Sequence, residues 1–434
     1  MYNIRMARIL IILSFLFCAM SSSAQEMTCD SAVVQTSDSI IVQKMRQAGV
    51  KFYKHNQVKL LKSGSAKFHD MLKAISLAES SVHLDYFNFR NDSIAKRLFR
   101  HLAERSANGV EVRAIYDSFG NMSNSRPLKK KHLKTIEGWG IEIREFDKIK
   151  FPWVNHVWRH DHRKIVVIDG KVAYSGGMNV ADYYVDGLPK IGPWRDMHFR
   201  VQGPVINEYQ KTFFGNWNTL TRQNIHGAKY YCGIDSVEHS FLPDEFNDSL
   251  HTDVMVGVVS RLPVIQPKIM RQMYIEAIDA AQYKIQIISP YFVPCPSIKK
   301  AIKRALKRGV DVQIMLSAKS DIPLTPDAGF YVANKLRKKG AQYYLYQNGF
   351  HHSKIMMVDD LFCTIGSANL DSRSLKFDYE INALFIDKGV TKELSDMYEI
   401  DKLHSVRQTS KHWKKKPFLK KFVAWFGYLL GPFI

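Results

Sequence analysis

The sequence predicts an α/β protein made of two tandem copies of one unit. Each copy is expected to be a mixed, largely parallel sheet flanked by helices, and pseudo-two-fold symmetry is expected to relate the copies. Three observations support this. Residues 71–117 recur, with small gaps, between 270 and 317. Helical patterns alternate with short apolar strand patterns in both copies. A string of polar residues then follows at the same relative place in each copy.

Both copies contain the same elements in the same order. In the first copy, residues 67–225, these are helix 71–75, strand 82–86, a basic helix 94–107 closed by Gly109, strand 110–115 and a short strand after Gly140. In the second copy, residues 265–410, the matching segments are 273–278, 285–289, 298–308, 310–315 and a strand after Gly340. Alternating strands and helices favour a parallel sheet covered on both faces. Residues 226–264 are predicted to be a linker.

The composition indicates a globular protein with anionic partners. The chain has 434 residues, of which 46% are hydrophobic and 24% charged, enough to bury the cores of two or three domains. Its 62 Lys and Arg against 41 Asp and Glu give a formal charge of +21, which favours nucleic acid, acidic membranes or phosphate-bearing substrates. The 5 cysteines form no CxxC pair or zinc-type cluster, so neither a disulfide scaffold nor a structural metal site is expected.

Residues 1–24 predict a cleaved signal peptide. Arg5 and Arg8 precede the apolar run Ile9–Met20, and small residues up to Ala24 offer a cleavage site. An uncleaved anchor is the alternative, although the run is shorter than the roughly 18 residues of a spanning helix. Residues 25–66 form an N-terminal segment for which the sequence predicts no role.

The polar string is the strongest functional signal. It reads His162, Lys164 and Asp169, then Gly176 and Asn179, and recurs with identical spacing as His352, Lys354, Asp359, Gly366 and Asn369. A lone His-x-Lys is usually a solvated strand end. Two copies inside an independently found repeat make a functional role the better interpretation.

The spacing has a chemical meaning. In an extended strand, alternate side chains share a face, so the histidine and lysine of each motif point the same way. Pairing of the halves would then gather two imidazoles, two ammonium groups and the amides of Asn179 and Asn369 around one pocket. Cations and amides can hold phosphodiester oxygens while one imidazole attacks phosphorus and the other protonates the leaving alcohol. Because the lysines supply the positive charge, no metal or other cofactor is expected.

Four carboxylates accompany the motifs. Asp196 and Glu380 follow them, and we expect these two to orient the imidazoles through the far ring nitrogen. Asp169 and Asp359 lie on the opposite strand parity and are interpreted as buried structural partners. The predicted catalytic set is the whole motif of each copy, His162, Lys164, Asp169, His352, Lys354 and Asp359, with Asn179, Asp196, Asn369 and Glu380 binding the substrate or orienting the imidazoles.

At these residues the sequence resembles the phospholipase D superfamily, whose HxKx4D signature with a Gly- and Asn-containing turn occurs twice, and within it bacterial cardiolipin synthases. The resemblance runs from about Lys67 to the C-terminus and includes 165–179, 194–196, 290–292 and 366–374. It implies two phospholipase D-like domains. It also implies that phosphatidylglycerol forms a phosphatidyl-histidine, releases glycerol and is attacked by a second phosphatidylglycerol to give cardiolipin, with His162 as nucleophile and His352 as acid and base.

Residues 411–434 contain no acidic residue and mix lysines with aromatics, a composition typical of a helix lying on anionic lipid. A helix packed on the protein's own core is the alternative. With the signal segment, this tail predicts a peripheral enzyme on the periplasmic side of a bacterial inner membrane. Its expected partners are phosphatidylglycerol and anionic lipids, and no nucleic acid.

Three other functions use the same residues differently. A nuclease would suit the charge of +21, but the signal segment and the tail oppose it. A phospholipase D would use water in place of the alcohol, and because pocket shape and water exclusion decide this, the sequence leaves it open. A non-enzymatic lipid-binding scaffold is opposed by the intact histidines and lysines.

Overall fold

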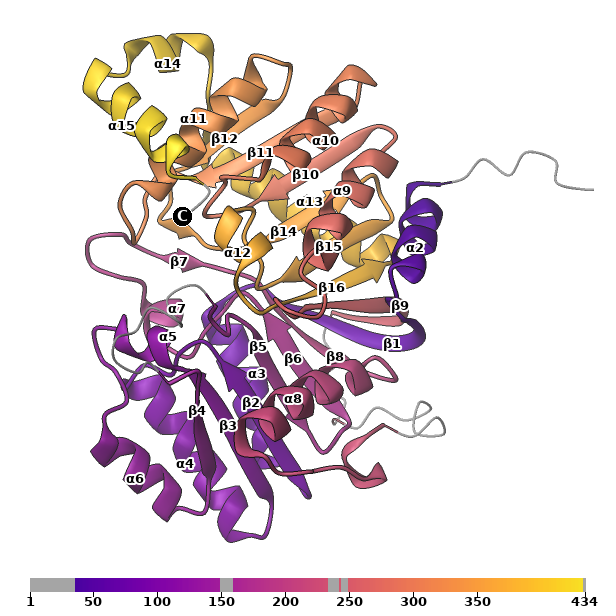
Figure 1. The fold of residues 1–434 in the computed structure, drawn as a ribbon, viewed down its shortest axis with the longest axis vertical. Coiled ribbons are helices and arrows are strands. Elements are labelled where there is room, and N and C mark those ends of the chain that lie inside the picture. The colour runs from indigo at the N-terminus through magenta and orange to yellow at the C-terminus, as the bar shows by residue number, and fades with distance from the viewer. Residues whose placement is uncertain (1–35, 149–158, 233–241, 243–248, 432–434) are drawn as a thin grey trace, which may run out of the picture. The chain divides into compact units, whose positions relative to one another are not determined.

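The computed structural model describes residues 36–148, 159–232, 242 and 249–431 (Figure 1). The predicted signal peptide, residues 1–24, lies outside these ranges. The described residues from Ser37 onward form one compact unit, and all that follows concerns this unit.

One mixed sheet of 15 strands runs through both halves of this unit, in the order β17-β12-β11-β10-β14-β15-β16-β9-β1-β8-β6-β5-β2-β3-β4. The first half supplies β1 (Phe52–Leu61), β2 (Ser81–Tyr86), β3 (Glu111–Asp117), β4 (Glu142–Phe146), β5 (Lys164–Ile168), β6 (Val172–Gly176) and β8 (His198–Gln202). The second supplies β9 (Leu250–Arg261), β10 (Lys284–Ile288), β11 (Asp311–Ser317), β12 (Gln342–Tyr346), β14 (Ile355–Val358), β15 (Phe362–Gly366), β16 (Glu380–Ile386) and β17 (Ser405–Arg407).

The strand order is nearly palindromic about the pair β9–β1, as expected for two copies related by a pseudo-two-fold axis. β1 and β9, the first strands of the two halves, pair antiparallel with each other and so join the halves into one sheet. Figure 1 shows the two strands side by side between the halves. β9 lies within the predicted linker 226–264, and β1 lies within the segment 25–66. Both segments therefore contribute to the sheet, while the proposed domain ranges stay predictions.

The predicted α/β class with a mixed sheet is confirmed, but the expectation of a largely parallel sheet is wrong. In the described sheet, the parallel pairs are β2–β3, β3–β4, β10–β11 and β11–β12, and the other ten neighbouring pairs are antiparallel. The reason is local. Each motif strand turns straight back into the next strand, and Asp169 and Asp359 take the positive φ values, +53° and +51°, that begin these hairpin turns.

Helices cover both faces of the sheet. In the first half they are α2 (Ser37–Gln47), α3 (Gly64–Ser76), α4 (Ser93–Ala107), α5 (Ser118–Met122), α6 (Lys130–Gly138), α7 (Tyr183–Asp186) and α8 (Ile206–Thr221). In the second they are α9 (Ile269–Ala280), α10 (Pro296–Lys307), α11 (Thr325–Arg337), α12 (Ser372–Lys376), α13 (Lys388–Leu403), α14 (Ser410–Lys415) and α15 (Phe418–Leu429).

The apolar strands are buried on both faces because alternate residues enter different cores. Val166 and Ile168 of β5 pack with residues of α3 and α4, whereas Ile165 and Val167 pack with residues of α8 and α13. This explains why β5 is a continuous apolar run rather than an alternating one. The motif residues that precede β5 and β14 are thereby fixed to a rigid scaffold.

The C-terminal helix α15 has two different faces. Ala424 and Gly427 are buried, and a Cβ on Gly427 would come within 3.1 Å of Leu324, so this face packs beside α11 (Figure 1). The other face exposes apolar side chains, including Phe418 (83%) and Phe426 (46%). The helix is therefore packed on the core by one side only, and the interpretation of its exposed side as a lipid-binding surface stays a prediction.

Candidate active site

Each motif histidine is anchored to the opposite half of the molecule. The backbone N–H of His162 donates to the carbonyl of Tyr379 at 3.0 Å, and that of His352 donates to the carbonyl of Arg195 at 2.7 Å. The short strands β7 (Trp194–Arg195) and β13 (Phe350–His351) also pair between the halves. These contacts bring the two motifs together at the interface between the two halves.

The side chains of the two motif histidines also contact the opposite half. His162 Nδ1 lies 3.0 Å from Glu380 Oε1, and His352 Nδ1 lies 2.6 Å from Asp196 Oδ2. Each carboxylate thus contacts the histidine of the other copy rather than that of its own. A carboxylate at Nδ1 fixes the proton there and leaves Nε2 free for chemistry.

The motif lysines lie against the histidines that precede them. Lys354 Nζ is 3.0 Å from His352 Nδ1 and 3.1 Å from its Nε2, and the ammonium groups of both lysines donate to the carbonyl oxygens of their own histidines. Burial lowers the pKa of Lys164 to about 7 and that of Lys354 to about 8. Near neutral pH the two ammonium groups are therefore at least partly charged, and a phosphate bound beside them would stabilise the charged form.

The two imidazole–carboxylate pairs differ electrostatically. Burial lowers the pKa of His162 well below its usual value, with Lys164 and Lys354 adding to this, and burial raises the pKa of Glu380 to about 7. In the other pair, burial would raise the pKa of Asp196, but Lys354 and His352 bring it below its usual value. The pKa of His352 is also lowered by burial and Lys354, with Asp196 opposing. An ionised carboxylate therefore faces His352.

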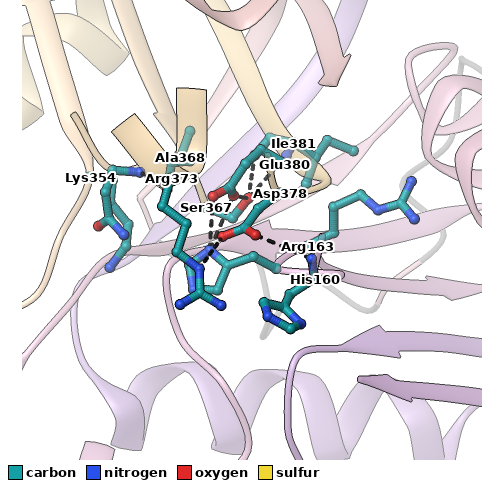
Figure 2. A network of polar contacts seen from close by, with 12 residues as sticks. His160, Arg163, Lys354, Ser367, Ala368, Arg373, Asp378, Glu380 and Ile381 are labelled. Carbon is teal, nitrogen blue, oxygen red and sulfur yellow. Dashed lines mark hydrogen bonds and ion pairs between the residues drawn. The ribbon is translucent and has the colours of Figure 1, made fainter. Parts of the chain in front are cut away.

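A polar network surrounds Glu380 on the His162 side (Figure 2). The hydroxyl of Ser367 donates to Glu380 Oε2. The neighbouring Asp378 accepts hydrogen bonds from the backbone of His160 and from Arg373 Nε, both at 3.2 Å. Burial raises the pKa of Asp378 to about 7. This network holds the carboxylate and the arginine beside it in place.

His162 and His352 line a pocket of about 660 Å³ built from both halves. Asn179 and Asn369 of the two motif turns line it as well. Its wall is strongly aromatic: Phe87, Phe119, Tyr183, Tyr184, Trp194 and Tyr291. A wall of this kind can hold the apolar part of a ligand while the motif residues hold its polar part.

The structure does not bring the motif aspartates into this pocket. Asp169 accepts hydrogen bonds from the backbone N–H groups of Glu79, Ser80 and Ser81 at 2.8–2.9 Å. Asp359 accepts from residues 282–284 in the same way, at 3.0 Å. Both carboxylates tie a hairpin turn to the start of a neighbouring strand. These contacts are structural, and neither aspartate is among the residues that line the pocket, so their place in the predicted catalytic set stays a prediction.

Sequence reasoning missed several residues around the site. Lys67 of α3 is fully buried and its Nζ donates to the carbonyl of Asn179 at 3.1 Å, so it supports the motif turn. In the second half, the hydroxyl of Tyr274 donates to the carbonyl of Ala368 at 3.2 Å. Arg90 and Arg373 line the pocket. Of these residues, only Arg373 was marked in the sequence, because it lies within the motif-like string 366–374. Lys67, Tyr274 and Arg90 reach the site only because distant elements pack together.

Comparisons with known proteins agree with this geometry. A family model described as "Cardiolipin synthase, PLD-like domain" matches residues 71–187 and 274–401. "Cardiolipin synthase 2" of Staphylococcus epidermidis is 34% identical over 382 residues, covering 87% of this chain and 75% of that protein. A cardiolipin synthase of Listeria monocytogenes is also 34% identical, covering 87% and 76%.

Solved structures show the same fold. The phosphatidylserine synthase of Haemophilus influenzae superimposes with a TM-score of 0.68 at 13% identity, covering 90% of this chain and 99% of that one. The polyphosphate kinase of Porphyromonas gingivalis gives a TM-score of 0.53 at 12% identity, covering 86% and 53%.

The chain therefore belongs to the phospholipase D-like family that includes the bacterial cardiolipin synthases. It is a cardiolipin synthase-like phosphatidyltransferase, an enzyme that moves a phosphatidyl group between alcohols. The superfamily predicted from the two motif copies is confirmed.

The structural role of Asp169 can be tested by stability. Asp169→Ala removes the acceptor of three backbone N–H groups, of which that of Ser81 is buried, and should lower the free energy of unfolding by about 2–4 kcal/mol. Thermal unfolding followed by circular dichroism measures this. Asp396→Ala, which removes an exposed ion pair with Lys392, should change stability by about 0.5 kcal/mol or less. An Asp169→Ala protein that melts like the wild type yet has lost turnover would place this residue in the chemistry.

Proposed function

We propose that this enzyme converts two phosphatidylglycerol molecules to cardiolipin and glycerol through a phosphatidyl-histidine intermediate. The observation that carries the proposal is the pair of crossed imidazole–carboxylate contacts, since it supports two Nε2 atoms at one pocket. A displacement with a covalent intermediate needs a nucleophile on one side of phosphorus and a proton donor on the other. The relatives named as cardiolipin synthases support the choice of substrate.

The electrostatic difference between the pairs supports an order for the two histidines. His162, whose pKa burial and the motif lysines lower well below its usual value, is held neutral and acts as nucleophile. His352 faces the carboxylate of Asp196, whose pKa lies below its usual value, so its protonated form is better stabilised and it acts as the acid.

The reaction then balances in two steps. His162 Nε2 forms a bond to phosphorus while the bond from phosphorus to the glycerol oxygen breaks, and His352 gives its proton to that oxygen. A headgroup hydroxyl of a second lipid next loses its proton to His352 and displaces His162. The motif lysines and asparagines hold the nonbridging oxygens throughout. Because one phosphodiester is exchanged for another, no energy source is required.

The intermediate provides the first test. His162→Ala should abolish turnover and yield no lipid–protein adduct, whereas His352→Ala should keep some adduct because the nucleophile is intact. Acid-quenched protein incubated with radiolabelled phosphatidylglycerol and digested for mass spectrometry locates the adduct. An adduct on His352 in the His162→Ala protein would reverse the two roles. Phosphatidic acid as the sole product of wild-type protein would indicate a hydrolase.

The lysines provide a test through pH. Below a pKa of about 7 for Lys164 and about 8 for Lys354 the ammonium groups are charged, and above these values they become neutral. The ratio kcat/KM should therefore fall between about pH 7 and 8 as the pH rises, because it reports the free enzyme. In Lys164→Arg the guanidinium stays charged, so the part of the fall due to this residue should move to higher pH. An identical profile in both proteins would contradict the role of Lys164.

We also propose that the enzyme binds anionic membranes peripherally through the exposed face of α15. No helix among the described residues is long and apolar enough to cross a membrane. The exposed aromatics Phe422, Trp425 and Phe426 share the tail with Lys414, Lys415, Lys420 and Lys421. Lysines can meet lipid phosphates while aromatic rings enter the headgroup layer. The signal segment supports a periplasmic location.

Point substitutions test this surface without removing the helix that covers α11. Replacing Phe422, Trp425 and Phe426 with serine should weaken binding to phosphatidylglycerol vesicles about tenfold or more and spare turnover of detergent-dispersed lipid. Vesicle co-sedimentation measures the binding. The control is Leu403→Ser, which alters an exposed side chain (83%) at the end of α13. Undiminished vesicle binding by the triple variant would refute the tail as the membrane contact.

A further inference from the structure

The proposed reaction leaves one charged group without a binding site. In the proposed reaction the motif histidines, lysines and asparagines hold a single phosphate, the one that is attacked. A second phosphatidylglycerol acting as acceptor carries its own phosphate, which stays intact and becomes the second phosphate of the product. A buried anion requires a cation or several donors beside it. The pocket should therefore hold a second phosphate-binding group.

Two arginines also line the pocket, Arg90 and Arg373. With the offset of 190 residues between the motif copies, the position in the first copy that is equivalent to Arg373 is Tyr183. The Arg90 guanidinium lies over the Tyr183 ring, 5.5 Å from its centroid. The two guanidinium groups thus occupy roughly equivalent ends of the pocket, one in each half.

The ends are distinguished by the histidine that each approaches. Arg373 belongs to the His162 end, because it donates to Asp378 and its charge contributes, after burial and the lysines, to lowering the pKa of His162. Arg90 belongs to the other end. The Tyr183 ring beneath it lies 4.4 Å from Trp194, and Trp194 lies 5.4 Å from His352, each measured between ring centroids.

The chemistry selects the His352 end for the acceptor. Entering and leaving groups lie roughly in line at phosphorus, so glycerol leaves on the side opposite His162. The acceptor hydroxyl then enters from that same side, where His352 takes its proton. The acceptor's own phosphate, one glycerol unit further out, lies beyond His352 and toward Arg90.

The contacts of Arg90 leave it able to bind an anion. Its side chain is 17% exposed, Nη2 donates to the exposed Ser125 at 3.1 Å, and the buried Nε makes no hydrogen bond within the described residues. The nearest carboxylate is Asp92, 3.8 Å from Nε, and burial raises the pKa of this carboxyl to about 6. A guanidinium N–H that lacks an acceptor suits an oxygen of a phosphate.

A carboxylate beside this end suits the rest of the headgroup. Asp321 lines the pocket and accepts the hydroxyl hydrogen of Tyr291. Burial raises the pKa of Tyr183, and the charge of Asp321 adds to this. Burial lowers the pKa of His352, and the charge of Asp321 opposes this. Guanidinium for phosphate and carboxylate for glycerol hydroxyls together complement a phosphoglycerol headgroup.

We propose that Arg90 binds the phosphate of the acceptor lipid and so selects a phosphate-bearing alcohol over a simple one. The inference rests on the proposed function, because it assigns the acceptor side of the same pocket. In the second copy the position equivalent to Arg90 is Val293, by alignment of Phe89 with Phe292. The selectivity for a charged acceptor is therefore built into one half only.

Competition between two acceptors tests this directly. Phosphatidylglycerol in detergent micelles serves as donor and as phosphate-bearing acceptor, and added 1-butanol serves as an acceptor without phosphate. Arg90→Gln should lower cardiolipin formation about 10- to 100-fold, as expected for loss of a charge-assisted contact, while phosphatidylbutanol formation stays within about twofold. Arg90→Lys should recover part of the cardiolipin activity. Arg100→Gln, an exposed arginine of α4, is the matched control and should change neither product.

The outcomes separate the inference from the proposed function. Equal loss of both products in Arg90→Gln, or loss of neither, would overturn the role of Arg90. Loss of cardiolipin alone in Arg373→Gln and not in Arg90→Gln would place the acceptor phosphate at the other end. Wild-type protein that forms neither product would refute the phosphatidyl transfer itself.

Discussion

The crossed contacts between each imidazole and the carboxylate of the opposite half are the constraint on which the rest of the structure depends. Two histidines, two lysines and two carboxylates share one largely buried site, and charged groups removed from water need partners. Because the partners come from opposite halves, neither half contains a complete site. The β1–β9 pairing and the short β7–β13 ladder hold the halves in the register that these contacts require.

The two copies have also diverged at positions that make the pairs unequal. Where the second copy has Ser367 donating to Glu380, the first has Gly177, and a Cβ there would come within 2.3 Å of Asp196 Oδ1. In the first copy the shorter Asp196 therefore lies close to the backbone at Gly177. In the second copy the longer Glu380 accepts a hydrogen bond from the hydroxyl of Ser367. These differences place a carboxylate of lowered pKa beside one histidine and a carboxylate of raised pKa beside the other. A symmetric scaffold can thereby supply a nucleophile and an acid.

Features encoded over a few residues were predictable from the sequence. The helices and strands of both copies followed from local periodicity, and the spacing of His162 and Lys164 indicated a shared face. The crossed pairing was not predictable, because His162 and Glu380 are separated by 218 positions and nothing local specifies which copy a carboxylate serves. The strands β1 and β9 were missed for the same reason, since each is defined by pairing with a distant strand. Arg90 lies outside every motif and enters the pocket only through packing.

The crossed pairing can be measured directly by NMR of protein labelled with ¹⁵N-histidine. Imidazole Nδ1 protons bonded to carboxylates resonate at low field, and His162→Gln and His352→Gln assign the two signals. Asp196→Asn should shift or remove the signal of His352 and leave that of His162, while Glu380→Gln should do the reverse. A spectrum in which Asp196→Asn instead perturbs His162 and spares His352 would contradict the account, because each carboxylate would then serve its own half.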